Sequence, residues 1–328
     1  MGAAAGMTLV PRGAFGRATP HWQDWDGEVM GAMSSIKLLG PDAEKSSELV
    51  EACLKEVRRL EALFSLHDQD SAISRLNAQG SLDNPDANFV KLMQVSDQIH
   101  EKTEGAFDVS VQPLWHLYRE HFSKNADADP KGPTRARVEA ALKLVDQDAI
   151  EIGSKHIRFL KPGMGVTLNG IAQGYITDRI TELLCGNGID RVLVDMGEFR
   201  GLGLNRRGEP WQVGLVNPRS EFHLAGFVEL DNFALATSGA YGFEFDKAGR
   251  FHHIFDAKTG LSTARNLAVS VMAPSAALAD GLSTAFSGME LKQISQVLAS
   301  YPGAGAIVTD FDGRHIKIGQ LPEMNLGS

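Results

Sequence analysis

Asp280 and Thr284 lie four residues apart in a stretch with the pattern of a helix. Apolar residues recur there every four positions and predict its buried face: Leu278, Leu282 and Phe286. The same spacing brings the oxygens of Asp280 and Thr284 together on another face. A carboxylate and a hydroxyl placed in this way suit a hard cation such as Mg²⁺. The alternative is a surface aspartate beside a threonine whose hydroxyl bonds a nearby carbonyl.

Two adjacent histidines, His252 and His253, precede Asp256 in a second polar stretch. Such a pair could supply zinc ligands, an acid and a base, or only the decoration of a strand. Neighbouring side chains of a strand point to opposite faces, which disfavours a site that uses both rings. We therefore expect at most one of the two histidines to face a site. The alternative is one exposed histidine and one hydrogen-bonded structural histidine.

Two glycine-containing stretches could also hold a ligand. Thr103–Trp115 predicts a helix end that turns into a strand, where Asp108 either caps the turn or holds a ligand hydroxyl. Thr167–Asp178 predicts a glycine-rich start of a helix, whose free N–H groups suit an anion, unless Asn169 only caps it. Common nucleotide and hydrolase motifs do not occur in the sequence, and the glycines of Gly201–Gly208 miss the dinucleotide spacing.

The predicted helices and strands that must position these stretches do not alternate strictly along the chain, and this pattern predicts an α+β fold. The predicted helices cover Ser46–Phe64, Asp86–Thr103, Thr134–Val145, Gly170–Leu184, Ala276–Phe286 and Leu291–Ser300. The predicted strands cover Gly27–Leu39, Ala149–Ile152, His156–Phe159, Arg191–Val194, Trp211–Val216, Leu224–Leu230, Phe233–Ala236, Leu267–Met272 and Ala306–Thr309. The breaker-rich segment Ser123–Pro133 is expected to be a mobile surface loop.

Composition excludes several classes of protein. The chain has 328 residues, 43% of them hydrophobic and 22% charged, which is ordinary for a soluble globular protein. A net charge of -9 without a basic cluster argues against a nucleic-acid partner. The sequence contains no apolar run of about 18 residues, so no membrane span is predicted. No signal peptide is evident either, although Leu9–Gly13 resembles a protease cleavage site of an expression tag. Cys53 and Cys185 are expected to be unpaired core residues.

Seven blocks, in order, resemble the ApbE family of FAD:protein FMN transferases. They are Met30–Ser35, Phe64–Asn77, Gly105–Asp108, Gly170–Arg179, Thr237–Gly239, His252–Gly260 and Ala279–Thr284. The resemblance implies one compact α+β unit over residues 27–320, with T-fold-like mixed sheets and packed helices. Residues 1–26 would then be flexible or tag-derived, and residues 321–328 a C-terminal tail.

The resemblance also implies roles for single residues. Asp280 and Thr284 would bind Mg²⁺ together with the carbonyl of Gly170, with Asp280 and His253 as the catalytic residues. Ser283 lies where some members have a further ligand. The FAD contacts would be Met30, His67, Ala106, Phe107, Asp108, Thr167, Gln173 and Ile254. This chain departs from the usual family residues at Thr167, Gln173 and His67, and Glu198 is assigned no role.

The implied reaction is a Mg²⁺-dependent transfer of FMN from FAD to a threonine or serine hydroxyl of another protein, which releases AMP. The implied acceptor is an FMN-binding domain of a membrane-associated electron-transfer complex, and the implied compartment is the periplasm. Two other activities use the same residues. One is a Mg²⁺-dependent FAD pyrophosphatase with water as the nucleophile, and the other is an FAD-binding redox or carrier protein.

Overall fold

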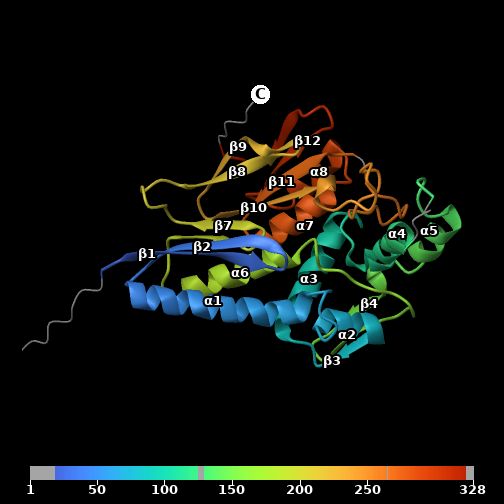
Figure 1. Cartoon of the computed structure of the whole chain (residues 1–328), viewed down its shortest axis with the longest axis horizontal. Helices are drawn as coiled ribbons and strands as arrows, with labels where there is room; N and C mark the ends of the chain where they lie inside the picture. Colours follow the sequence, from blue (N-terminus) through green and yellow to red (C-terminus); the bar gives the residue numbers. More distant parts are fainter. Residues whose placement is uncertain (1–18, 125–128, 264, 323–328) are drawn as a thin grey trace, which may run out of the picture.

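The computed structural model describes residues 19–124, 129–263 and 265–322. An eight-stranded sheet with antiparallel neighbours forms the centre of the molecule (Figure 1). Its strands, in spatial order, are β1 (His21–Val29), β2 (Ala32–Gly40), β6 (Val192–Asp195), β7 (Phe199–Leu202), β10 (Phe233–Gly239), β11 (Ala268–Ala273), β12 (Gly305–Thr309) and β13 (His315–Gly319). Two smaller sheets pair β3 (Ser81–Asp83), β5 (His156–Phe159) and β4 (Ile150–Ile152), and β8 (Trp211–Asn217) with β9 (Ser220–Leu230).

Helices cover one face of the large sheet, and the β8–β9 hairpin covers part of the other (Figure 1). The described helices are α1 (Ala43–Phe64), α2 (Ala72–Gln79), α3 (Ala87–Lys102), α4 (Gln112–Lys124), α5 (Arg135–Leu142), α6 (Ala172–Gly186), α7 (Ala276–Phe286) and α8 (Leu291–Leu298). Of these, α4 and α5 do not lie on the sheet and instead form a separate small core that includes Phe255. Strand β6 illustrates the layering, because Val192 and Val194 join the core under the helices while Leu193 joins the core under the hairpin. Alternate side chains of a strand point to opposite faces, so a strand buried on both faces is apolar throughout.

The predicted α+β class is confirmed by this mixture of sheets and packed helices. The single strand predicted over Gly27–Leu39 is instead a hairpin, β1–β2, which reverses at Met30 and Gly31. Both turn residues adopt positive φ angles, 49° and 80°, as a tight two-residue hairpin turn requires. Strand β1 begins at His21, inside the segment that was expected to be flexible or tag-derived.

The strand expected after Thr103 is also wrong. The chain forms the 3₁₀ turn Val109–Val111 and then enters α4, with Pro113 in the first turn, where its missing N–H costs no helical hydrogen bond. Helix α2 was not predicted from the sequence; Ser71 caps its start and Gly80 its end. The expected loop Ser123–Pro133 falls partly on residues 125–128, which lie outside the described residues.

Both described cysteines are free, as predicted, but only one is a core residue. Cys53 is buried in α1, whereas Cys185 lies exposed near the end of α6, so the expectation for Cys185 is corrected. Within the described chain no helix combines the length and apolar character that crossing a membrane requires.

Close contact between α6 and α7 depends on a glycine. A Cβ atom on Gly174 would lie 2.3 Å from the carbonyl oxygen of Ala276, too close for any side chain. We expect Gly174→Ala to destabilise the protein by about 1–3 kcal/mol through overpacking, measured as the free energy of unfolding in urea. The matched control is Gly186→Ala on the same helix, where a Cβ meets nothing within 4 Å. It should be neutral or stabilising by up to about 1 kcal/mol. Equal losses in both variants would contradict the contact.

Candidate active site

Helices α6 and α7 meet at one end through hydrogen bonds that cross between them. Asp178 of α6 accepts hydrogen bonds from the backbone N–H groups of Ala276 and Ala277, at 2.8 and 2.9 Å. These are the first N–H groups of α7, which have no acceptor within their own helix. Arg200 pairs with the same carboxylate. The start of α7 is thereby fixed against α6, and its later turns face the residues that precede and open α6.

This packing brings the three predicted metal ligands together. The backbone N–H of Gly174 donates to Oδ2 of Asp280 at 3.0 Å. One turn later, the hydroxyl of Thr284 donates to the carbonyl oxygen of Gly170 at 3.4 Å. A Cβ on Gly170 would lie 2.9 Å from Oγ1 of Thr284, so the two backbones can approach this closely only because Gly170 has no side chain. Three hard oxygens therefore lie beside one another, two from α7 and one from the turn that precedes α6.

A cavity of about 240 Å³ opens beside these oxygens. Ten of the twelve predicted site residues line it, namely Ala106, Phe107, Asp108, Thr167, Gly170, Gln173, His253, Ile254, Asp280 and Thr284. The other two are elsewhere. Met30 lies in the β1–β2 turn, where its N–H donates to Glu61 at 2.8 Å, and His67 lies in the turn after α1.

Two buried carboxylates, Asp280 and Glu198, line this cavity. Burial raises the pKa of Asp280 to about 7, with Asp178 raising it further and the N–H of Gly174 opposing the rise. Burial also raises the pKa of Glu198 well above its usual range, and the neighbouring Asp280 adds to the effect. Among the described residues that line the cavity there is no lysine or arginine. Such a pair favours a bound cation, since a cation would offset both desolvated charges.

A row of hydroxyls at the edge of the cavity supports Thr284. Ser238 of β10 lies 2.7 Å from Oγ of Ser283 and 3.2 Å from Oγ1 of Thr284. Ser283 also donates to the carbonyl of Asp280 at 2.9 Å and is fully buried. Ser283 does not line the cavity, so its role here is to orient its neighbours.

The two histidines separate in the way that the sequence suggested. His252 is buried and bonds the carbonyl of Thr263, while His253 lines the cavity. Nδ1 of His253 lies 3.1 Å from the carbonyl oxygen of Phe243, and because a carbonyl can only accept, Nδ1 carries the proton. Burial lowers the pKa of His253, which keeps the ring neutral at neutral pH. Nε2 is then left as an acceptor, the form that a general base needs.

Asp108 caps the turn, the first of the two roles that the sequence left open, and it also lines the cavity. Its Oδ1 accepts from the N–H of Ser110 at 2.7 Å and so caps the 3₁₀ turn, while its side chain also lines the cavity. Burial raises the pKa of Asp108.

Sequence reasoning missed three groups of lining residues. Glu198 lines the cavity and follows Gly197, whose φ of 100° marks a sharp turn between β6 and β7. An acidic residue directly after a glycine was the sequence feature that could have identified Glu198 as a site residue. Trp115 and Tyr241 add aromatic walls, and Thr237 and Ser238 were matched as a motif without a role.

Comparison with known proteins identifies the family of the chain. The model of the ApbE family matches residues 30–308. The FAD:protein FMN transferase of Haemophilus influenzae is 32% identical over 79% of this chain and 78% of its own length. That of Salmonella typhimurium is 28% identical over 86% and 82%. The structure of the flavin transferase ApbE from Vibrio cholerae superimposes with a TM-score of 0.77 at 26% identity and covers 92% of this chain and 98% of its own. The predicted resemblance is confirmed: the chain belongs to the ApbE family.

Proposed function

We propose that this protein is an FAD:protein FMN transferase that moves FMN from FAD to a threonine or serine hydroxyl of an acceptor protein. The observation that carries the proposal is that one cavity holds both a set of oxygen ligands, on Asp280, Thr284 and Gly170, and a neutral histidine, His253. Relatives that cover more than three quarters of the chain are named for this activity.

The residues present fit Mg²⁺. Mg²⁺ takes oxygen ligands and usually retains waters or substrate phosphates in its other positions, and Asp280, Thr284 and Gly170 offer a carboxylate, a hydroxyl and a carbonyl. The elevated pKa of Asp280 fits a carboxylate that lacks a cationic partner within the described chain. A bound Mg²⁺ would neutralise charge on the diphosphate of FAD and polarise the phosphorus on the FMN side.

The chain's own residues then act on the acceptor. His253 holds its Nδ1–H on Phe243 and presents Nε2 to the acceptor hydroxyl, whose proton it takes. The hydroxyl oxygen attacks the phosphorus of the FMN half in line, and the bond from that phosphorus to the bridging oxygen breaks. AMP leaves with the bridging oxygen, and FMN remains on the acceptor as a phosphoester.

Two rival activities would use the same cavity. A pyrophosphatase would give FMN and AMP at the same rate with or without an acceptor, and a redox or carrier protein would return FAD intact. The names of the relatives favour transfer. As acceptor we propose an FMN-binding domain of a membrane-associated electron-transfer complex, and as compartment the periplasm.

The metal is tested separately from the acceptor. AMP release from FAD should stop when a chelator is added and should return with Mg²⁺ more fully than with Zn²⁺, because all three proposed ligands are hard oxygens. The measurement is AMP formed, separated by chromatography, at matched concentrations of free metal. Better activation by Zn²⁺ would contradict the oxygen ligand set and point to the histidine pair.

A further inference from the structure

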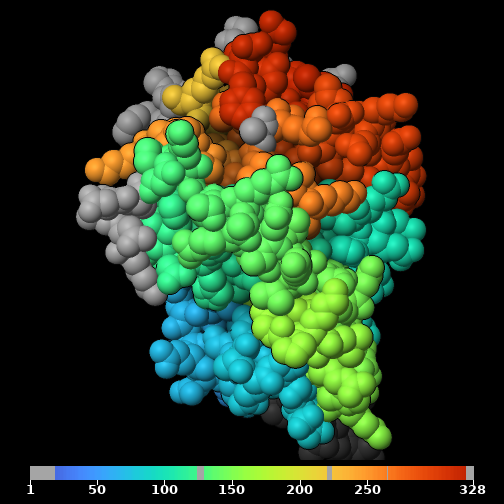
Figure 2. All heavy atoms as spheres, turned by 90° about the vertical axis from the view of Figure 1, so that its right-hand side faces the viewer, coloured from blue at the N-terminus to red at the C-terminus, as the bar shows by residue number. Residues whose placement is uncertain are grey.

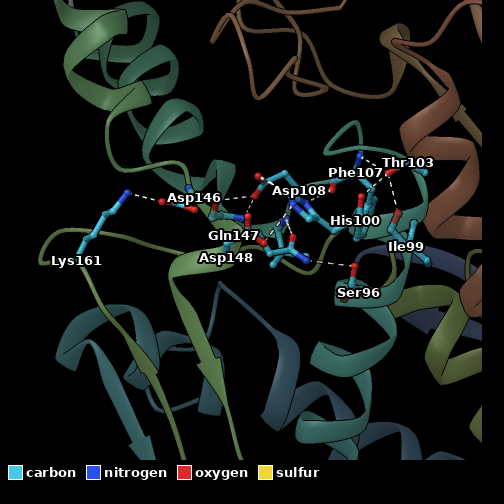
Figure 3. Close-up of polar contacts among 12 residues, drawn as sticks. Ser96, Ile99, His100, Thr103, Phe107, Asp108, Asp146, Gln147, Asp148 and Lys161 are labelled. Atoms are coloured by element: carbon cyan, nitrogen blue, oxygen red, sulfur yellow. Dashed lines mark hydrogen bonds and ion pairs between the residues drawn. The ribbon is translucent and has the colours of Figure 1, made fainter.

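His100 of α3 lies behind the cavity wall, beside the segment Ala106–Asp108 (Figure 3). Its ring borders a separate open hollow of about 630 Å³, and Asp108 lines both that hollow and the cavity. Figure 2 shows this side of the molecule from the outside, where teal, green and orange segments adjoin. His100 itself does not line the cavity. It therefore reaches the proposed FAD site only through the backbone and side chains of this segment.

Two hydrogen bonds join His100 to this segment and to Gly105, the residue before it. Nδ1 of the ring bonds the carbonyl oxygen of Phe107 at 2.8 Å, and the carbonyl of His100 accepts from the N–H of Gly105 at 3.0 Å. Since the Phe107 carbonyl can only accept, Nδ1 carries the proton. Thr103 adds a third bond, from the N–H of Phe107 at 3.1 Å. Both polar groups of the Phe107 backbone are thus bonded to α3 or the residue that ends it.

The same ring nitrogen faces the Asp108 carboxylate. Nδ1 of His100 lies 3.8 Å from Oδ2 of Asp108, while Oδ1 is occupied by the N–H and the hydroxyl of Ser110. Burial raises the pKa of Asp108, while the two hydrogen bonds from Ser110 and, to a lesser extent, the nearby His100 lower it. Within the described chain Oδ2 has no hydrogen-bond donor besides this distant ring, which leaves it able to accept from a ligand.

We propose that His100 is a positioning residue for FAD. Its Nδ1–H holds the Phe107 carbonyl, and its ring sets the orientation in which Oδ2 of Asp108 accepts from a hydroxyl of the bound dinucleotide. The inference rests on the proposed function, because it takes FAD as the ligand of the cavity. Loss of the bond should weaken FAD binding and leave the chemical step unchanged, since His100 touches no reacting atom.

Two substitutions separate the two ring nitrogens. In His100→Asn the side-chain amide takes the place of Nδ1 and can still donate to Phe107, whereas in His100→Gln the longer amide takes the place of Nε2 and points toward Asp148. We expect the dissociation constant of FAD, from equilibrium fluorescence titration of the full chain, to rise about three- to tenfold in His100→Gln, as for one lost hydrogen bond. His100→Asn should stay within about twofold of wild type. Turnover at saturating FAD should not change in either variant.

Two results would overturn the inference. Wild-type FAD affinity in both variants would show that the bond to Phe107 does not matter, and equal losses in both would show that the ring is needed only for packing. A melting temperature for each variant shows whether it is folded. Failure of the wild type to bind FAD is a different result, since it would overturn the proposed function together with this inference.

Discussion

Asp280→Asn is expected to lower FMN transfer by at least about 100-fold at limiting Mg²⁺, while the protein remains folded. The introduced amide would keep an oxygen to accept from the N–H of Gly174, so the contact between α6 and α7 survives. The substitution removes the negative charge of the only carboxylate among the three proposed ligands. Loss of an outer partner alone costs about 10- to 100-fold in metal affinity, and loss of a ligand charge should cost no less. The measurement is the initial rate of acceptor flavinylation as a function of free Mg²⁺.

Ser283→Ala is the matched control for Asp280. Ser283 lies on the same helix and bonds the carbonyl of Asp280, but it does not line the cavity. We expect it to reduce the rate much less than Asp280→Asn at every Mg²⁺ concentration. A rate for Asp280→Asn within about threefold of wild type at limiting Mg²⁺ would show that the metal is held elsewhere.

Substitution of His253 should slow the chemical step by about 10²–10⁴-fold and leave FAD affinity nearly unchanged. His253→Asn is the informative variant, because its amide can replace Nδ1–H on Phe243 while Nε2 is lost. The measurement is the single-turnover rate of transfer. The wild-type rate should fall as pH falls through the pKa of His253, because protonation removes the base. Since burial lowers that pKa, the fall should occur below the ordinary value of about 6.5.

His252→Gln is the control for His253. His252 is buried and its ring is bonded to the carbonyl of Thr263, so its replacement should lower the melting temperature more than the rate of the folded protein. If both histidine variants lost rate equally, or if His253→Asn lost only FAD affinity, the pair would be structural. The proton acceptor would then have to be sought on another group.

Local patterns were sufficient for much of the fold and of the site. Helix α7 has apolar residues every four positions, and that period alone placed Asp280 and Thr284 on a shared face. The same logic failed at Met30, because alternation continues through a two-residue hairpin turn and the sequence period does not show the reversal. It also failed after Thr103, where contacts with Gln147 and Thr167 favour a 3₁₀ turn over an extended strand.

What the sequence could not provide were the contacts between distant segments. Glu198 reaches Asp280 only because β7 lies in the large sheet beside β10, against which α7 packs. Which of the two histidines lines the cavity likewise depends on the loop from 243 to 263. In this loop the carbonyl of Phe243 bonds the ring of His253, and the carbonyl of Thr263 bonds the ring of His252. His100 and Asp108 are eight positions apart in the sequence, and their side chains lie close together only because the chain turns between them.

The proposed function requires that FMN be transferred to a hydroxyl of another protein. The most direct measurement is the mass of an FMN-binding acceptor domain after incubation with this protein, FAD and Mg²⁺, compared with an acceptor in which the modified threonine or serine is replaced by alanine. We expect the intact acceptor to gain the mass of FMN less one water, with an equal amount of AMP released, and the alanine variant to gain nothing. An unchanged acceptor mass while FAD is cleaved to FMN and AMP would contradict transfer and identify a pyrophosphatase.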